Sequence, residues 1–242
     1  MIRLRSAVLI IHGFAGGTYD QENLANYLEV NRHLDVYSFT LPGHDVKSLE
    51  KATCREWIKE SEKQIEFLID NGYKRIYLVG HSMGGVIATY LSTKYKQVKK
   101  LVLAAPAFSH LASEEEGGLL GALGKSVDII KAYDTDEFFT RVRKLPISAF
   151  KEFLKLVEKY QYTKNEIKVP VMIVHGKKDQ IVPISSSIEI FENLNVSKKE
   201  LILVNGYYHD LFKGSKVKNL SKEIEKFLIT RKYKLKEIKK DL

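Results

Sequence analysis

The chain has 242 residues, of which 44% are hydrophobic and 29% are charged, and this balance is typical of a single soluble globular domain. No apolar run approaches the roughly 20 residues that a membrane-spanning helix needs, and the single cysteine, Cys54, excludes an intrachain disulfide and fits a cytoplasmic location. The formal net charge is +9, but the basic residues form no aromatic-interleaved patch, so we expect no nucleic-acid partner.

Short apolar runs alternate along the chain with longer amphipathic stretches. The runs are rich in Val, Ile and Leu and predict strands at residues 6–13, 34–40, 75–80, 98–106, 169–176 and 200–206. The stretches with helical spacing of apolar residues include 22–31, 55–72 and 83–95. Because such strands are apolar along almost their whole length, this alternation predicts an α/β fold with a mostly parallel central sheet and helices on both faces.

Residues 107–168 interrupt the alternation. They contain helical patterns, the acidic "SEEE" and the glycine-rich "GGLLGALGKS", but no strand pattern. The segment is too long for an unstructured loop in a compact domain, and it begins directly after a strand. We therefore expect a small helical cap over the carboxyl ends of the strands, inserted between core segments 1–106 and 169–230. A structural linker is the alternative interpretation.

The chain ends in a basic tail, residues 231–242, with six basic and two acidic residues. Such a run is typical of the solvated end of a last helix. A weak contact with a membrane surface is the alternative, and it would suit an enzyme that acts on lipids.

The most informative motif is "GHSMG", residues 80–84, a G-x-S-x-G sequence with a predicted strand before it and a predicted helix after it. This context is that of a nucleophile elbow, in which the turn is so sharp that Gly80 and Gly84 cannot be replaced by residues with a Cβ. The turn would place the Ser82 hydroxyl at the amino end of a helix, where developing negative charge is favoured. A glycine-lined site of helix packing is the alternative.

A serine hydroxyl needs a base to take its proton and an acid to orient that base. In this class of fold the order along the chain is Ser, Asp, His, and only His209 lies beyond the last plausible acid-bearing strand. Asp179 alone among the intervening aspartates follows a strand, whereas Asp210 is expected to point away from its neighbour His209. The other aspartates of this interval fall in the expected cap: Asp128, Asp134 and Asp136.

The loop after the first strand reads "HGFAGG", residues 12–17, and its glycines allow the backbone to approach a substrate closely. In a nucleophile-elbow fold this loop and the residue after the nucleophile supply the N–H groups of the oxyanion hole. The expected donors are the backbone N–H groups of Phe14 and Met83. A plain glycine-rich turn is the competing interpretation.

Five motifs, "IHGFAGG", "LPGHD", "VGHSMGG", "HGKKDQIVP" and "GYYHD", together resemble the α/β-hydrolase superfamily. The chain is most similar to its small bacterial carboxylesterases and to its monoacylglycerol lipase/lysophospholipase group, and the resemblance extends from Ala7 to about Ile229. It implies an α/β-hydrolase fold, a catalytic triad of Ser82, Asp179 and His209, and an oxyanion hole at Phe14 and Met83.

The expected activity is hydrolysis of carboxylic esters through an acyl-enzyme. An apolar acyl group is expected to contact residues of a substrate pocket: Phe14, Phe108, Ile181, Val182 and Leu211. Peptidase, thioesterase and acyltransferase activities on the same triad stay open, as does a catalytically silent protein that binds anionic lipid. No histidine pair or Cys/His cluster has the spacing of metal ligands, no glycine pattern indicates a nucleotide cofactor, and the chain could be a monomer or a homodimer.

Overall fold

A sheet of parallel strands forms the centre of the computed structural model, which describes residues 5–44, 52–108, 146–179, 181–213, 217–230 and 236–242. Within these residues the sheet has seven strands in the order β2-β1-β3-β4-β5-β6-β7, and every neighbouring pair is parallel. The strands are β1 Ser6–Ile11, β2 Leu34–Phe39, β3 Ile76–His81, β4 Val98–Ala104, β5 Val171–Gly176, β6 Lys198–Val204 and β7 Lys236–Asp241. The predicted parallel sheet is thereby confirmed.

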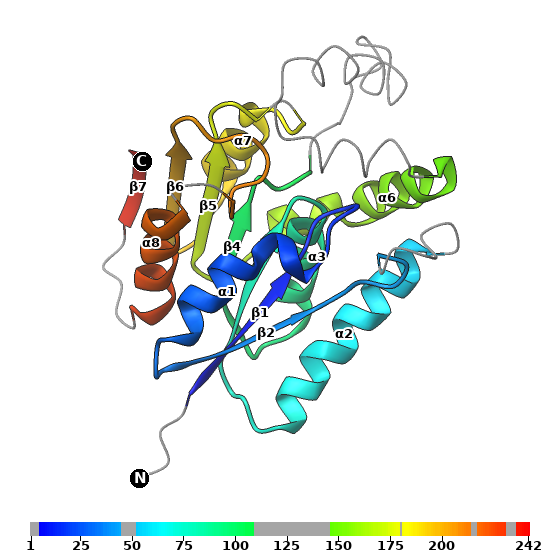
Figure 1. Cartoon of the computed structure of the whole chain (residues 1–242), viewed down its shortest axis with the longest axis horizontal. Helices are drawn as coiled ribbons and strands as arrows, with labels where there is room; N and C mark the ends of the chain where they lie inside the picture. The colour runs from blue at the N-terminus through cyan, green and yellow to red at the C-terminus, as the bar shows by residue number, and fades with distance from the viewer. Residues whose placement is uncertain (1–4, 45–51, 109–145, 180, 214–216, 231–235) are drawn as a thin grey trace.

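Helices cover both faces of this sheet (Figure 1). They are α1 Glu22–Glu29, α2 Cys54–Asp70, α3 Met83–Lys94, α6 Ile147–Tyr160, α7 Ile184–Asn193 and α8 Val217–Ile229, with 3-10 turns η1 Thr18–Gln21 and η4 Gln161–Glu166. Side chains of α2, α3, α6 and α7 form one apolar cluster, and those of α1 and α8 form a second cluster on the opposite face.

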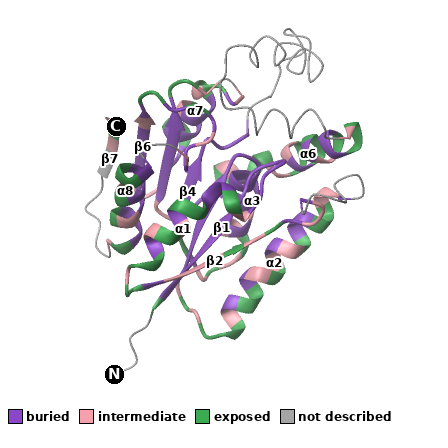
Figure 2. Cartoon of the chain, in the orientation of Figure 1, coloured by how far each residue is buried: buried purple, intermediate pink, exposed green. Residues whose placement is uncertain are grey.

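Strands β1, β3 and β5 are buried along their whole length because they lie between these two layers, whereas the edge strand β2 is only partly buried (Figure 2). Successive side chains of a strand point to opposite faces, so β1 contributes Leu9 and Ile11 to the first cluster and Val8 and Ile10 to the second. This double burial explains why the strands have continuous apolar sequences rather than alternating ones.

The expected cap, residues 107–168, is described only at its two ends, because residues 109–145 lie outside the described part of the chain. Helix α6 and turn η4 occupy Ile147–Glu166. The buried face of α6, including Phe150 and Phe153, belongs to the same apolar cluster as the sheet. The division into core and cap therefore stays a prediction.

The basic tail corrects one expectation, because it does not continue the last helix. Helix α8 ends at Ile229, and residues 236–241 form β7, which pairs with β6 at the edge of the sheet. Neighbouring residues of a strand face opposite sides, so Lys239 reaches Glu192 of α7 at 3.4 Å while Lys240 pairs with Glu223 of α8. The charged sequence did not predict a strand, because its lysines are accommodated by acidic partners on the helices of both covering layers.

None of the helices within the described ranges is both long enough and apolar enough to cross a membrane.

Candidate active site

Ser82 lies at a strained turn between β3 and α3. Its backbone has φ 52° and ψ −117°, a region that residues with a side chain rarely adopt. A Cβ on Gly80 would lie 2.3 Å from the carbonyl oxygen of Gly84, and a Cβ on Gly84 would lie 2.2 Å from that of Ile11. Both glycines are therefore required, and the turn packs directly against the end of β1. The strand–turn–helix context expected from the sequence is present.

The loop after β1 lies against this turn. A Cβ on Gly13 would be 3.1 Å from the Cβ of Ser82. His12 fixes the loop, because its Nδ1–H donates to the Gly13 carbonyl at 2.8 Å and its Nε2 accepts from the Leu41 N–H at 2.9 Å. Burial, assisted by the nearby His44, lowers the pKa of His12 to about 3, so the ring stays neutral in this role.

The two predicted oxyanion donors, Met83 and Phe14, belong to the two segments that meet at Ser82. Met83 is the first residue of α3, and the first N–H groups of a helix have no partner within the helix and carry partial positive charge. Phe14 follows Gly13 in the loop that contacts Ser82, and its ring packs between Trp57, Phe150 and Phe153 with centroid separations of 5.1–6.1 Å. This packing holds the backbone of the loop in place from the side of α2 and α6.

His209 and Asp179 form a buried pair on the loops that follow β6 and β5. The Nδ1 of His209 donates to Oδ2 of Asp179 at 2.7 Å. Oδ1 of Asp179 accepts from the N–H groups of Ile181 and Val182 at 2.9 and 3.0 Å. The backbone of its own loop thus orients the Asp179 carboxylate independently of the bond to His209.

Burial and pairing oppose each other in this pair. Burial disfavours the charged carboxylate, but the attraction of His209 and the hydrogen bonds of His175 and His209 outweigh it and hold the pKa of Asp179 well below its ordinary range. Burial likewise disfavours a charged imidazole, yet the Asp179 carboxylate raises the pKa of His209 above its ordinary value of 6.5. The arrangement favours an imidazolium stabilised by a fixed carboxylate.

The His209 loop also contacts the serine turn. Nε2–H of His81 donates to the carbonyl oxygen of His209 at 3.0 Å, and the two rings lie 4.8 Å apart. Burial, followed by the charge of His209, lowers the pKa of His81, so the ring acts as a neutral donor. A Cβ on Gly176 would lie 2.3 Å from the Tyr208 carbonyl oxygen, so this glycine allows the loop to approach β5.

The contacts of His81 and Gly176 were not predicted from the sequence. A glycine at the end of the strand before the acid was the available signal for Gly176.

The expected pocket residues divide between the two apolar clusters. Phe14, Phe108 and Val182 belong to the first cluster, and Ile181 packs against it. Leu211 belongs to the second cluster and is fully buried there. The structure therefore separates Leu211 from the other four, because its side chain turns toward the face that α1 and α8 cover.

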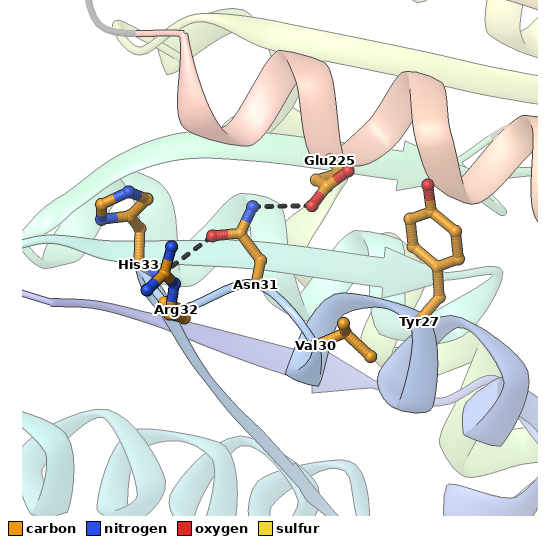
Figure 3. Close-up of a pocket in the computed structure, with 6 residues that line it drawn as sticks. All are labelled: Tyr27, Val30, Asn31, Arg32, His33 and Glu225. Atoms are coloured by element: carbon orange, nitrogen blue, oxygen red, sulfur yellow. Dashed lines mark hydrogen bonds between the residues drawn. The ribbon is translucent and has the colours of Figure 1, made fainter.

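A surface pocket lies away from these residues, near the amino end of β2. It is lined by residues from the end of α1, the turn before β2, and α8 (Figure 3): Tyr27, Val30, Asn31, Arg32, His33 and Glu225. Nδ2 of Asn31 donates to Glu225 at 2.6 Å, and Oδ1 of Asn31 accepts from the His33 N–H at 2.9 Å. None of the predicted site residues lines this pocket.

Known proteins resemble the chain over most of its length. A family profile described as the alpha/beta hydrolase fold matches residues 6–122, and one described as serine aminopeptidase, S33, matches residues 118–216. The thermostable monoacylglycerol lipase of Bacillus sp. (strain H-257) is 26% identical over 214 residues, with 84% of this chain and 82% of the lipase covered. The carboxylesterase of Bacillus subtilis (strain 168) is 28% identical over 206 residues, with 81% and 80% covered.

Solved structures share the fold. The crystal structure of the Paleococcus ferrophilus monoacylglycerol lipase superimposes with a TM-score of 0.66 at 24% identity, and covers 92% of this chain and 93% of the lipase. The overall fold of the chain is thus that of a known architecture.

Proposed function

This chain belongs to the α/β-hydrolase superfamily, and we propose that it hydrolyses carboxylic esters through an acyl-enzyme formed on Ser82. The coarser part of this statement, an esterase or monoacylglycerol-lipase-like hydrolase, rests on its relatives. The single observation that supports the finer part is the buried His209–Asp179 pair, joined through His81 to the turn that carries Ser82.

Acylation begins when His209 accepts the proton of the Ser82 hydroxyl and the oxygen attacks the ester carbonyl. The N–H groups of Phe14 and Met83 stabilise the oxyanion that forms, and Asp179 stabilises the imidazolium. Collapse of the tetrahedral intermediate breaks the bond to the alcohol, which leaves with the proton that His209 returns.

Deacylation repeats these steps with water as the nucleophile. His209 takes a proton from water, the hydroxide attacks the acyl carbonyl, and the acid departs as Ser82 regains its proton. The overall reaction converts ester and water into alcohol and carboxylic acid, and it needs no further co-reactant. The aromatic and aliphatic residues around Phe14 favour an apolar acyl group.

The test is hydrolysis of p-nitrophenyl esters of increasing acyl length, with monoacylglycerols alongside, by the native chain and by Ser82→Ala. We expect a length optimum for the native chain and a loss of about 10⁴-fold or more in the variant. Ser92→Ala is a matched control, because Ser92 lies at the far end of α3 and donates only to the Thr89 carbonyl. Equal turnover by Ser82→Ala would overturn the proposal.

A second candidate activity is that of a peptidase, favoured by the description of the profile that matches residues 118–216. An aminopeptidase must bind the ammonium group of its substrate, commonly with a carboxylate. Two carboxylates that act on the site histidines, Asp20 and Asp210, both pair with Lys213, at 3.1 and 3.5 Å. This pairing favours the ester over the free amine. Aminoacyl p-nitroanilides distinguish the two, and their faster turnover would replace the ester assignment.

A further inference from the structure

A second histidine, His175, contacts the same carboxylate oxygen of Asp179 as His209 does. We propose that His175 is a positioning residue of the hydrolytic site and that Ser187 sets its tautomer, so that the two residues fix the orientation and basicity of Asp179. This inference rests on the proposed function. His175 lies at the end of β5 and Ser187 on α7, and both are completely buried.

The surroundings of His175 define which ring nitrogen carries the proton. Nε2 lies 3.0 Å from the carbonyl oxygen of Val182 and 3.2 Å from Oδ2 of Asp179. Both partners are acceptors, so Nε2 must be protonated; it donates to the Val182 carbonyl and lies in contact with the Asp179 carboxylate. Nδ1 lies 2.7 Å from the hydroxyl of Ser187, which can donate to an unprotonated nitrogen. The ring therefore presents its Nε2–H to Val182 and Asp179, and donation by the Ser187 hydroxyl to Nδ1 favours this tautomer.

This contact adds to the hydrogen bonding of the carboxylate. Oδ1 accepts from the N–H groups of Ile181 and Val182, and Oδ2 accepts from His209. Nε2 of His175 lies 3.2 Å from the same Oδ2, so the carboxylate is held by three hydrogen bonds and by this fourth contact. Since His175 also donates to the Val182 carbonyl, it attaches the loop that carries Asp179 to β5, and Ser187 extends the attachment to α7.

The contact also affects the proton affinity of His209. The N–H of His175 beside Oδ2 stabilises part of the negative charge that Asp179 offers to the imidazolium. Removing this donor should strengthen the attraction and raise the pKa of His209. The other ionisable groups that act on His209 are His81 of β3 and Asp210 of its own loop. Lys213 pairs with Asp210. The substitutions below leave His81, Asp210 and Lys213 unchanged.

The experiment compares ester turnover and pH profiles of His175→Leu and His175→Gln with the native chain. Leucine removes the donor, whereas glutamine retains a side-chain N–H. We expect His175→Leu to lower kcat by roughly 10- to 100-fold, because a displaced carboxylate misplaces the base, and to move the acid limb of kcat/KM to higher pH. We expect His175→Gln to recover most of kcat and return the limb toward its native position.

A purely structural role would give a different pattern, in which His175→Leu lowers the melting temperature but leaves kcat per folded molecule and the acid limb unchanged. That pattern would overturn the inference. Should His175→Leu fail to fold, Ser187→Ala gives the same test, and we expect it to shift the limb and lower kcat by a smaller factor. Its matched control is the adjacent Ser186→Ala, because Ser186 is also buried but its hydroxyl reaches only the Pro106 carbonyl at 3.5 Å.

Failure of the inference and failure of the proposed function give separate results. If the native chain hydrolyses no ester, the proposed function fails. If the native chain hydrolyses esters while His175→Leu and Ser187→Ala match it in kcat and in pH profile, only the role of His175 fails.

Discussion

Buried ionisable groups have different partners at the two ends of the parallel strands, here called the amino edge and the carboxyl edge of the sheet. At the amino edge, Nζ of Lys100 donates to three carbonyls at the end of α8, those of Phe227 (2.8 Å), Leu228 and Thr230 (2.7 Å). At the carboxyl edge, the side chain of Asp179 is also buried, but one of its partners is an imidazole that can exchange a proton. Both groups are hydrogen-bonded, and in the proposed mechanism only Asp179 acts on the catalytic base.

The difference shows what separates a structural charge from a functional one. An ammonium group has three donors, and the last carbonyls of a helix carry partial negative charge, so Lys100 is satisfied by a static cap of α8. Asp179 is held as firmly, yet the stabilisation it provides depends on whether His209 is protonated. A buried charge is thus a candidate for chemistry when its partner titrates, and not because it is buried.

The largest effect should come from removing that titrating partner. We expect His209→Ala to lower kcat/KM for the preferred ester by about 10⁴-fold, because no other group takes the proton of Ser82. Ester kinetics with the purified variant make the measurement, and His33→Ala, on the turn before β2, is the control. Near-native turnover in His209→Ala would refute the triad.

A smaller loss is expected when the His209 loop is displaced rather than its base removed. The added methyl of Gly176→Ala would meet the Tyr208 carbonyl at 2.3 Å, so the loop must shift, and a displacement on the order of 1 Å costs about 10²-fold in kcat. The control is Gly72→Ala, where φ is +85° but nothing lies within 4 Å; it should lower stability and leave kcat unchanged. Equal kcat in both variants would contradict this account.

At the amino edge, the effect should be on stability alone. We expect Lys100→Met to lower the free energy of unfolding by about 2–3 kcal/mol, because buried carbonyls lose their donor, with activity per folded molecule within about twofold of native. Chemical denaturation and ester kinetics on the same preparation measure both quantities. Lys99→Met, its exposed neighbour, should change neither. A selective loss of kcat in Lys100→Met would remove the contrast between the two edges.

The smallest effect is a shift along the pH axis. The raised pKa of His209 means that the free enzyme keeps the imidazole protonated above its ordinary value of 6.5, and a protonated base cannot accept the serine proton. The acid limb of kcat/KM should therefore have its midpoint above pH 6.5 and fall toward lower pH. Asp179→Asn removes the carboxylate charge and should move the midpoint to lower pH. A native midpoint below 6.5 would contradict the pairing.

Much of the architecture could be predicted, because the parallel topology leaves few alternatives. Six of the strands have apolar sequences, and parallel strands bring their carboxyl ends to one edge, so residues after those strands must lie near one another. This is why the order of Ser82, Asp179 and His209 along the chain sufficed to place Asp179 and His209 within hydrogen-bonding distance.

The parts that could not be predicted depend on contacts between distant residues. Strand β7 has a charged sequence whose acidic partners lie on α7 and α8, so composition gave no sign of it. Leu211 faces the opposite cluster because the direction of a loop side chain is set by packing and not by sequence neighbours. The contact of His175 with Ser187 joins a strand to a helix, and no spacing rule connects those two positions.

The most direct test of the central claim is covalent labelling by a fluorophosphonate, which forms an adduct with an activated serine. We predict one adduct on the native chain, mapped by peptide mass spectrometry to Ser82, a greatly reduced labelling rate in His209→Ala, and a native rate in Lys100→Met. Native, folded protein that stays unlabelled, or an adduct on another residue, would contradict the assignment of Ser82 as the nucleophile.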